Sequence, residues 1–191
     1  MFARRNGSAW SVLAPAKLNL CLDILGRRFD GFHELESVMT PVALYDRLEY
    51  SPGSLGTGEP FSFAALPWRR DAPLAPAGDD NLACRAVRRL ADAAGIEPQG
   101  RFLLRKSIPM AAGLGGGSSD AAAALVLANA AWGLGYDRPR LAGLAAELGS
   151  DVPFFLAGGP ACRRGRGENL QPLAALPPLP VVLVKPPQGG S

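Results

Sequence analysis

Residues 108–124, IPMAAGLGGGSSDAAAA, combine the residue types that bind phosphate. Glycine tolerates positive φ and lets backbone N–H groups approach a ligand closely. The alanine-rich helix expected next would point its unpaired N–H groups and positive dipole end at the same place. We therefore predict a phosphate-binding loop. Its residues are Gly113, Leu114, Gly115, Gly116, Gly117, Ser118 and Ser119.

This loop matches neither of the common nucleotide motifs. No lysine follows the glycines as a Walker A loop requires, and Ser118 stands where a dinucleotide fingerprint needs its third glycine. The alternative is a flexible turn capped by Ser119 or Asp120 before a structural helix. Two serines directly after the glycines are more polar than a cap requires, which favours the phosphate loop.

Lys17 lies in the apolar segment PAKLNL, at residues 15–20. The chain has only two other lysines, Lys106 and Lys185, against many arginines, so each lysine invites a specific role. A half-buried ammonium at position 17 would need an anionic partner. The alternative is a surface lysine on the solvent face of a strand.

Two turns carry further candidate residues. In GRRFDGFH, at residues 26–33, Phe32 and His33 could stack on and hydrogen-bond a flat heterocycle, although an ordinary hairpin turn would also fit. In GSDVP, at residues 149–153, Asp151 is either a turn former or a carboxylate placed as general base or metal ligand. A phosphate cradle, a lysine, a carboxylate and a base-recognising turn together favour phosphoryl transfer.

Composition narrows the class of protein. The 191 residues, 48% hydrophobic and 19% charged, are typical of a globular protein, and no stretch approaches the length of a membrane span. The net charge of +3 comes with scattered arginines, which favours an anionic small ligand over nucleic acid. His33 is the only histidine, so a zinc site or a Ser-His-Asp triad on any other histidine is excluded, and no metal ligands are assigned. Without a visible secretory signal, we expect a cytoplasmic protein.

The elements that must position these residues indicate an α+β fold. We expect strands first and then helices mixed with strands. The expected strands cover residues 11–25 in two parts around Pro15, then 36–44, 47–50, 61–64, 99–105, 154–156, 161–163 and 181–184. The expected helices cover 81–94, with Asp79 or Asp80 as N-cap and Gly95 as C-cap, then 119–132 and 139–148. A buried strand at 181–184 with almost nothing after it suggests a chain cut short, and a natural end with a disordered tail is the alternative.

Together PAKLNL, the DGFH turn, IPMAAGLGGGSSDAAA and GSDVPFF resemble the GHMP kinase superfamily, and within it the kinases that act on 4-diphosphocytidyl-2-C-methyl-D-erythritol in non-mevalonate isoprenoid synthesis. The resemblance runs from about residue 14 to the end. It implies a mixed sheet with a left-handed β-α-β unit and helices on one face. It also implies a flexible start at 1–8, an ATP-binding N-terminal domain at 9–172, and only the beginning of a C-terminal domain at 173–191.

The resemblance also assigns roles to individual residues. Asp151 would take the proton from the substrate's 2-hydroxyl, and Lys17 would stabilise the carboxylate and the developing alkoxide. Residues 113–119 would wrap the phosphates of ATP, with Pro109 and Lys106 beside them and Ser118 or Ser119 near Mg²⁺. Asn19 would position the erythritol part. Phe32, where the family usually has tyrosine, would pack on the cytosine that His33 reads. Asp120 would serve as an N-cap.

The resemblance implies ATP and the cytidine diphosphate conjugate as partners, with no nucleic acid or membrane, in a monomer or weak homodimer. Three alternatives stay open. A GHMP kinase for another small alcohol would have no base for the DGFH turn to recognise. A non-catalytic nucleotide-binding module would have the same cradle without transfer. An RNA-binding protein would need a stacking platform that this chain lacks.

Overall fold

A mixed sheet carries the fold of this computed structural model, which describes residues 1–27, 29, 31, 33–53, 60–67, 69, 72–165 and 169–185. In these residues the strand order is β1-β2-β3-β5-β4, with β6 added to the other end of β3 and β7 to β6. Only β4 and β5 pair in parallel, across the helix that connects them. The strands are β1 (Arg4–Asn6), β2 (Ala9–Arg27), β3 (His33–Ser51), β4 (Phe61–Leu66), β5 (Gly100–Arg105), β6 (Ala161–Gly165) and β7 (Asn169–Pro172).

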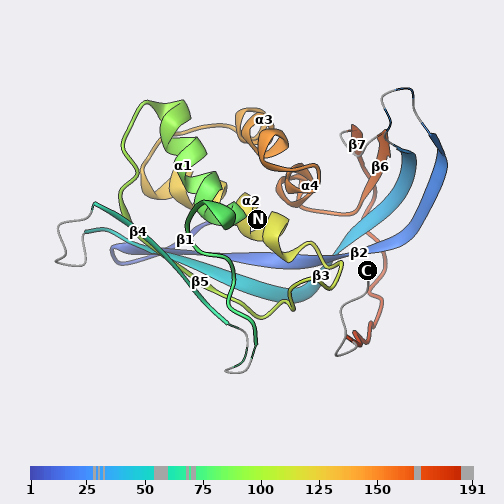
Figure 1. The fold of residues 1–191 in the computed structure, drawn as a ribbon, viewed down its shortest axis with the longest axis horizontal. Helices are drawn as coiled ribbons and strands as arrows, with labels where there is room; N and C mark the ends of the chain where they lie inside the picture. Colours follow the sequence, from blue (N-terminus) through green and yellow to red (C-terminus); the bar gives the residue numbers. More distant parts are fainter. Residues whose placement is uncertain are drawn as a thin grey trace.

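Every helix of the described chain lies on one face of the sheet (Figure 1). The predicted α+β class, the mixed sheet and the one-sided helices are thereby confirmed. None of these helices is long and apolar enough to cross a membrane. The helical elements are η1 (Gly78–Asp80), α1 (Leu82–Ala94), α2 (Gly116–Ala131), α3 (Arg138–Leu148) and α4 (Val152–Ala157).

The two long strands β2 and β3 form the spine of the sheet. We predicted a break in the first of them at Pro15, but β2 continues through it, and the pairing with β3 shifts register between Pro15 and Ala16. Proline is tolerated inside a strand at such an irregularity because its missing N–H need not join the ladder. Residues 36–44 and 47–50, predicted as two strands, likewise belong to β3 alone.

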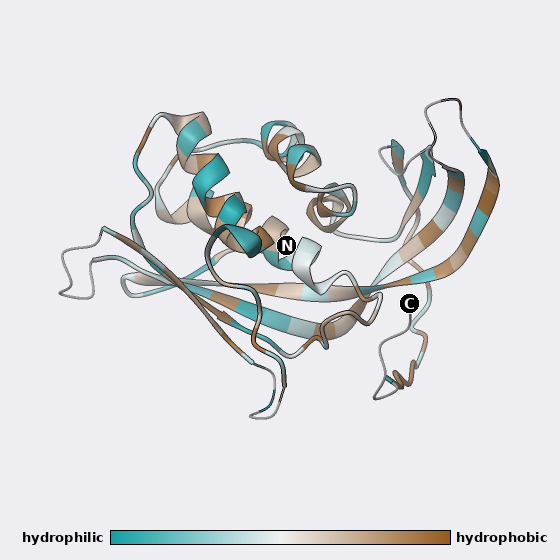
Figure 2. Ribbon diagram, viewed as in Figure 1, coloured by the Kyte–Doolittle hydropathy of each residue, from teal (hydrophilic) through white to brown (hydrophobic). Residues whose placement is uncertain are grey.

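Helix α2 fills the middle of the molecule. The side chains of Ala121, Ala122, Ala123 and Ala124 have no exposed area, and α2 packs against β2, β3, α1 and α4. A helix that is apolar on every side is buried on every side. By contrast, α1 turns a hydrophilic face outward and buries Val87 and Leu90 (Figure 2).

Helix α1 begins one residue later than predicted, and its N-cap is not one of the predicted residues. Asn81 caps it, because its side-chain oxygen accepts from Ala83 N at 3.0 Å and Cys84 N at 3.4 Å, whereas Asp79 and Asp80 belong to η1. Asparagine caps as well as aspartate does. The C-cap prediction is confirmed, with Gly95 at φ 66°.

Two predicted strands are wrong. Residues 154–156 lie in α4, where Pro153 occupies the favourable first turn, because a short apolar run fits a buried helix as well as a strand. Residues 181–184 take no regular structure, and Val182 and Val184 are 88% and 84% exposed. Strands β1 and β7 were not predicted, and β1 lies within the segment expected to be a flexible start.

We expect Gly100→Ala to lower the free energy of unfolding by about 1–3 kcal/mol. Gly100 has φ +82°, and a Cβ there would overlap the buried ring of Tyr50. Gly143→Ala is the control, because this helical glycine has open space around it and should gain up to about 1 kcal/mol in helix propensity. Urea unfolding of both variants measures the difference, and equal effects would contradict the close approach of Gly100 and Tyr50.

Candidate active site

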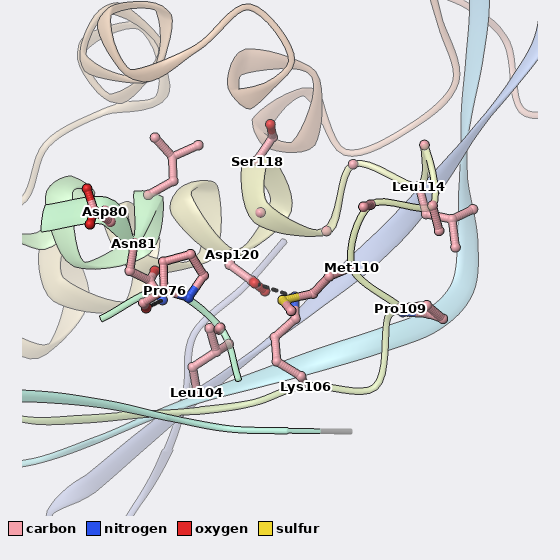
Figure 3. Close-up of a pocket in the computed structure, with 18 residues that line it drawn as sticks. Pro76, Asp80, Asn81, Leu104, Lys106, Pro109, Met110, Leu114, Ser118 and Asp120 are labelled. Carbon is pink, nitrogen blue, oxygen red and sulfur yellow. Dashed lines mark hydrogen bonds and ion pairs between the residues drawn. The ribbon is translucent and has the colours of Figure 1, made fainter. Parts of the chain in front are cut away.

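A cavity of about 400 Å³ opens beside the N-terminus of α2 (Figure 3). The start of α1, the end of β5 and the glycine-rich loop form its walls. The structure brings eight of the predicted nucleotide-binding residues to it, and Ser119 instead lies fully buried inside α2. These eight are Lys106, Pro109, Gly113, Leu114, Gly115, Gly116, Gly117 and Ser118.

The glycine-rich loop turns sharply into α2. Ala111, Gly113 and Gly115 all have positive φ, at 51°, 71° and 68°. Helix α2 begins at Gly116, three residues before its predicted start, with Gly115 as N-cap and no side-chain cap. The backbone N–H groups of the first helical turn therefore have no partner within α2 and are free for a ligand at the cavity.

A close contact joins this loop to β2. The N–H of Lys17 donates to the carbonyl oxygen of Leu114 at 2.9 Å. A Cβ on Gly115 would lie 2.9 Å from Lys17 Cγ and from Phe155 Cζ, so only glycine fits beside these two side chains. The loop is thus pressed against the lysine that the sequence analysis singled out.

Lys17 and Asp151 face each other on the other side of the loop. Their Nζ and Oδ2 atoms are 3.9 Å apart, and Lys17 Nζ also donates to Asn19 Oδ1 at 3.0 Å. Arg163 of β6 contacts Asp151 through Nη1 and Oδ1. The predicted pairing of Lys17 with an anion is confirmed, and the structure adds an arginine that the sequence analysis missed.

Burial, the largest effect, lowers the pKa of the Lys17 ammonium. The Asp151 carboxylate opposes this shift, and the Arg163 guanidinium adds to it. Only 8% of the Lys17 side chain is exposed, while a quarter of the Asp151 side chain is exposed. The carboxylate can therefore be reached by a ligand and the ammonium lies just behind it.

A second charged cluster lies under the cavity. Lys106 Nζ donates to Asp120 Oδ2 at 2.6 Å and also to Asp46 Oδ2. Asp46 is fully buried on β3, and its Oδ1 accepts from the backbone N–H groups of Ser107 and Ile108. Asp120 is not the predicted N-cap, because α2 begins four residues earlier and places it in the second turn.

Two carboxylates share one ammonium in this cluster. Burial, and then the Asp46 carboxylate, raise the pKa of Asp120 well above its usual value, against the opposing effect of Lys106. Burial would lower the pKa of Lys106, but Asp120 and Asp46 outweigh it and raise that pKa. Asp120 Oδ1 is buried without a hydrogen-bond partner in the described structure. The cluster therefore holds a proton more readily than separate side chains would.

The predicted cytosine-binding residues are not placed by the structure. Phe32 lies outside the described residues, and of His33 only the backbone is described, at the first position of β3. Asn19 lies on an exposed part of β2 beside Lys17. Asp46, Asn81 and Arg163 were not predicted as site residues from the sequence. Only Asn81 had a local signal, because it directly precedes an amphipathic helix.

Comparison with known proteins finds one matching family model and several similar chains. Residues 81–159 match the family model "GHMP kinases N terminal domain". The chain is 51% identical over 181 residues to 4-diphosphocytidyl-2-C-methyl-D-erythritol kinase of Pelotomaculum thermopropionicum, covering 95% of this chain and 60% of that protein. It is 49% identical over 179 residues to the enzyme of that name from a Synechococcus strain, covering 93% and 56%. The chain thus spans little more than half the length of these relatives.

Solved structures agree on the fold. A crystal structure of 4-(cytidine 5'-diphospho)-2C-methyl-D-erythritol kinase superposes with a TM-score of 0.71 at 44% identity, over 86% of this chain and 55% of that one. The mevalonate kinase of Methanococcus jannaschii superposes with a TM-score of 0.62 at 14% identity, over 90% and 57%. At that identity the likeness concerns the fold alone.

We expect the stability of the chain to fall as pH rises from about 4 through the raised pKa of Asp120. In that window the folded state keeps a proton that unfolded aspartate, with a pKa near 3.9, has released. Asp120→Asn removes this proton and should flatten the decline. The raised pKa of Lys106 acts only in the alkaline range and leaves this window unaffected.

Urea unfolding at several pH values between 4 and 8 measures the two slopes. Asp137→Asn, at the exposed N-cap of α3, keeps a capping side chain and serves as the control. Parallel curves for the Asp120→Asn variant and the unmodified chain would contradict proton retention by Asp120.

Proposed function

We propose that this chain is a GHMP kinase and that it transfers the γ-phosphoryl group of ATP to the 2-hydroxyl of 4-diphosphocytidyl-2-C-methyl-D-erythritol. The observation that carries the proposal is the position of Asp151 and Lys17 directly across Gly115 from the cavity at the N-terminus of α2. The proposed general base, its lysine partner and the phosphate-binding loop would thus meet at Gly115. The names and identities of the relatives support the choice of substrate.

The cavity suits the phosphates of a nucleotide. Its volume of about 400 Å³ lies within the range of small-molecule sites. The free N–H groups and dipole end of α2 would face the anionic oxygens. Asp120, which would otherwise repel the nucleotide, is paired with Lys106. Lys106 and the raised pKa of Asp120 would together keep negative charge off the cavity wall.

The residues at the loop also fit Mg²⁺. This ion keeps several waters and is bound by one or two protein groups together with substrate phosphates. Ser118, on the cavity wall, would supply a hydroxyl oxygen. The buried Ser119 Oγ has no hydrogen-bond partner in the described structure and lies one residue further along the helix. When bound, the ion would neutralise charge on the phosphates.

The chain's own groups would perform the proton transfer. Asp151 Oδ2 would accept the proton of the substrate's 2-hydroxyl. The hydroxyl oxygen would then bond to the γ-phosphorus of ATP while the bond from that phosphorus to the ADP oxygen breaks. Lys17, held by Asn19, would stabilise the negative charge that develops on the attacking oxygen. A base that is partly exposed and a cation that is buried suit these two roles.

Recognition of the substrate's cytidine is assigned to the DGFH turn. Phe32 would stack on the cytosine and His33 would hydrogen-bond its edge, since neutral imidazole offers one donor and one acceptor. Asn19, which accepts a hydrogen bond from Lys17, would contact the erythritol part. Phe32 and His33 would distinguish this substrate from alcohols without a base.

Asp151→Asn should lower kcat at least about 100-fold while the Kd for Mg-ATP changes little, because the amide keeps the shape of the side chain but takes no proton. ADP release with Mg-ATP and 4-diphosphocytidyl-2-C-methyl-D-erythritol measures turnover, and calorimetry measures binding. Asp137→Asn should match the unmodified chain. If the unmodified chain binds Mg-ATP but releases no ADP, the kinase proposal fails and the alternative of a non-catalytic nucleotide-binding module remains. Turnover that survives in the Asp151→Asn variant would remove Asp151 as the base.

A further inference from the structure

Arg163 reaches the predicted base from a different element. Asp151 precedes α4, and the chain then turns back into β6, so the two residues meet although they are 12 positions apart. Within β6, Arg163 pairs with Ser37 of β3, and its side chain is only 11% exposed. Its neighbour Arg164 faces the other way, with a 58% exposed side chain that pairs with Glu36.

The two cations bind different oxygens of one carboxylate. Arg163 Nη1 contacts Asp151 Oδ1, while Lys17 Nζ lies 3.9 Å from Oδ2, beyond hydrogen-bond distance. The tighter pairing is therefore with the guanidinium, whose planar donors fix a carboxylate in direction as well as in place. The Oδ2 atom keeps lone pairs for another donor.

We infer that Arg163 is a positioning residue of this site, which anchors Asp151 through Oδ1. Oδ2 is then left for the substrate hydroxyl, and the Lys17 ammonium is left for the anionic phosphoryl group. The inference rests on the proposed function, since it assigns Arg163 to the same reaction. Two cations around one carboxylate leave one positive charge in excess, which is the sign that a transferred phosphoryl group requires.

The arrangement has a signature that a purely structural arginine would not produce. The charged groups that act on Lys17 in the described structure are Asp151 and Arg163. Removing the guanidinium takes a cation away from Lys17 and frees Asp151 to approach it, and both changes raise the pKa of Lys17. Because the chain has only three lysines, the side-chain NMR signals of a ¹³C-lysine-labelled sample can be assigned one by one.

The test compares Arg163→Gln with Arg164→Gln, two neighbouring substitutions on opposite faces of β6. We expect Arg163→Gln to raise the Lys17 pKa and to lower kcat at least about 10-fold, because Asp151 loses its anchor. The KM for ATP should change less than about 2-fold, because the nucleotide site is unaffected. Arg164→Gln should leave all three quantities unchanged.

A Lys17 titration or a kcat in the Arg163→Gln variant that matches the Arg164→Gln variant would overturn the inference. If Arg163→Gln does not fold, Arg163→Lys decides the question. It keeps the charge but not the planar fork, so a lowered kcat supports the inference and an unchanged kcat overturns it.

The outcomes also separate this inference from the proposed function. Loss of turnover on Asp151→Asn but not on Arg163→Gln leaves the kinase proposal standing and removes the role of Arg163. Turnover that persists in the Asp151→Asn variant refutes the assigned base and the positioning role with it, whatever the Lys17 titration shows.

Discussion

The candidate site depends on the buried cluster of Asp46, Lys106 and Asp120. Each residue comes from a different part of the fold: Asp46 from β3, Lys106 from the end of β5, and Asp120 from α2. Removing one partner of such a cluster leaves an uncompensated buried charge, which typically costs about 3–5 kcal/mol. The cluster therefore fixes the sheet, the loop that leaves it and the helix that follows relative to one another. The free N–H groups at the start of α2 are aimed by this connection.

The glycine-rich loop separates two charged clusters that differ in charge balance. Under the cavity, two carboxylates share one lysine, and the backbone amides of Ser107 and Ile108 satisfy the rest of Asp46. Across Gly115, one carboxylate lies between Lys17 and Arg163. The cluster under the cavity is neutral while Asp120 keeps its proton, whereas the side with the excess positive charge is partly open to a ligand. Backbone geometry, and not a row of surface charges, sets where an anion would be accepted.

Sequence reasoning succeeded where the signal is local. The glycines, serines and alanines of residues 113–124 define a loop and a helix by residue type alone, and Lys17 is conspicuous in an apolar segment. Asp46 is different. In the alternating stretch YDRLEY it shares the inward face of Leu48 and Tyr50, but a carboxylate is buried only when it is paired, and its partners, Lys106 and the loop amides, lie some 60 positions away. Arg163 was missed for the same reason, since its partner Asp151 lies on another element. The helix at residues 154–156 was missed because a short apolar run does not specify its own period.

The contact of Gly115 with Lys17 and Phe155 has an evolutionary consequence. These three positions lie on α2's cap, β2 and α4, yet they share one small volume, so none of them can change freely while the other two stay as they are. A larger residue at position 115 becomes tolerable only with smaller ones at 17 or 155, and a smaller residue at 17 would no longer carry the ammonium. We therefore expect the three to be inherited as a unit, with substitutions at Phe155 confined to side chains that preserve the gap in which the loop turns.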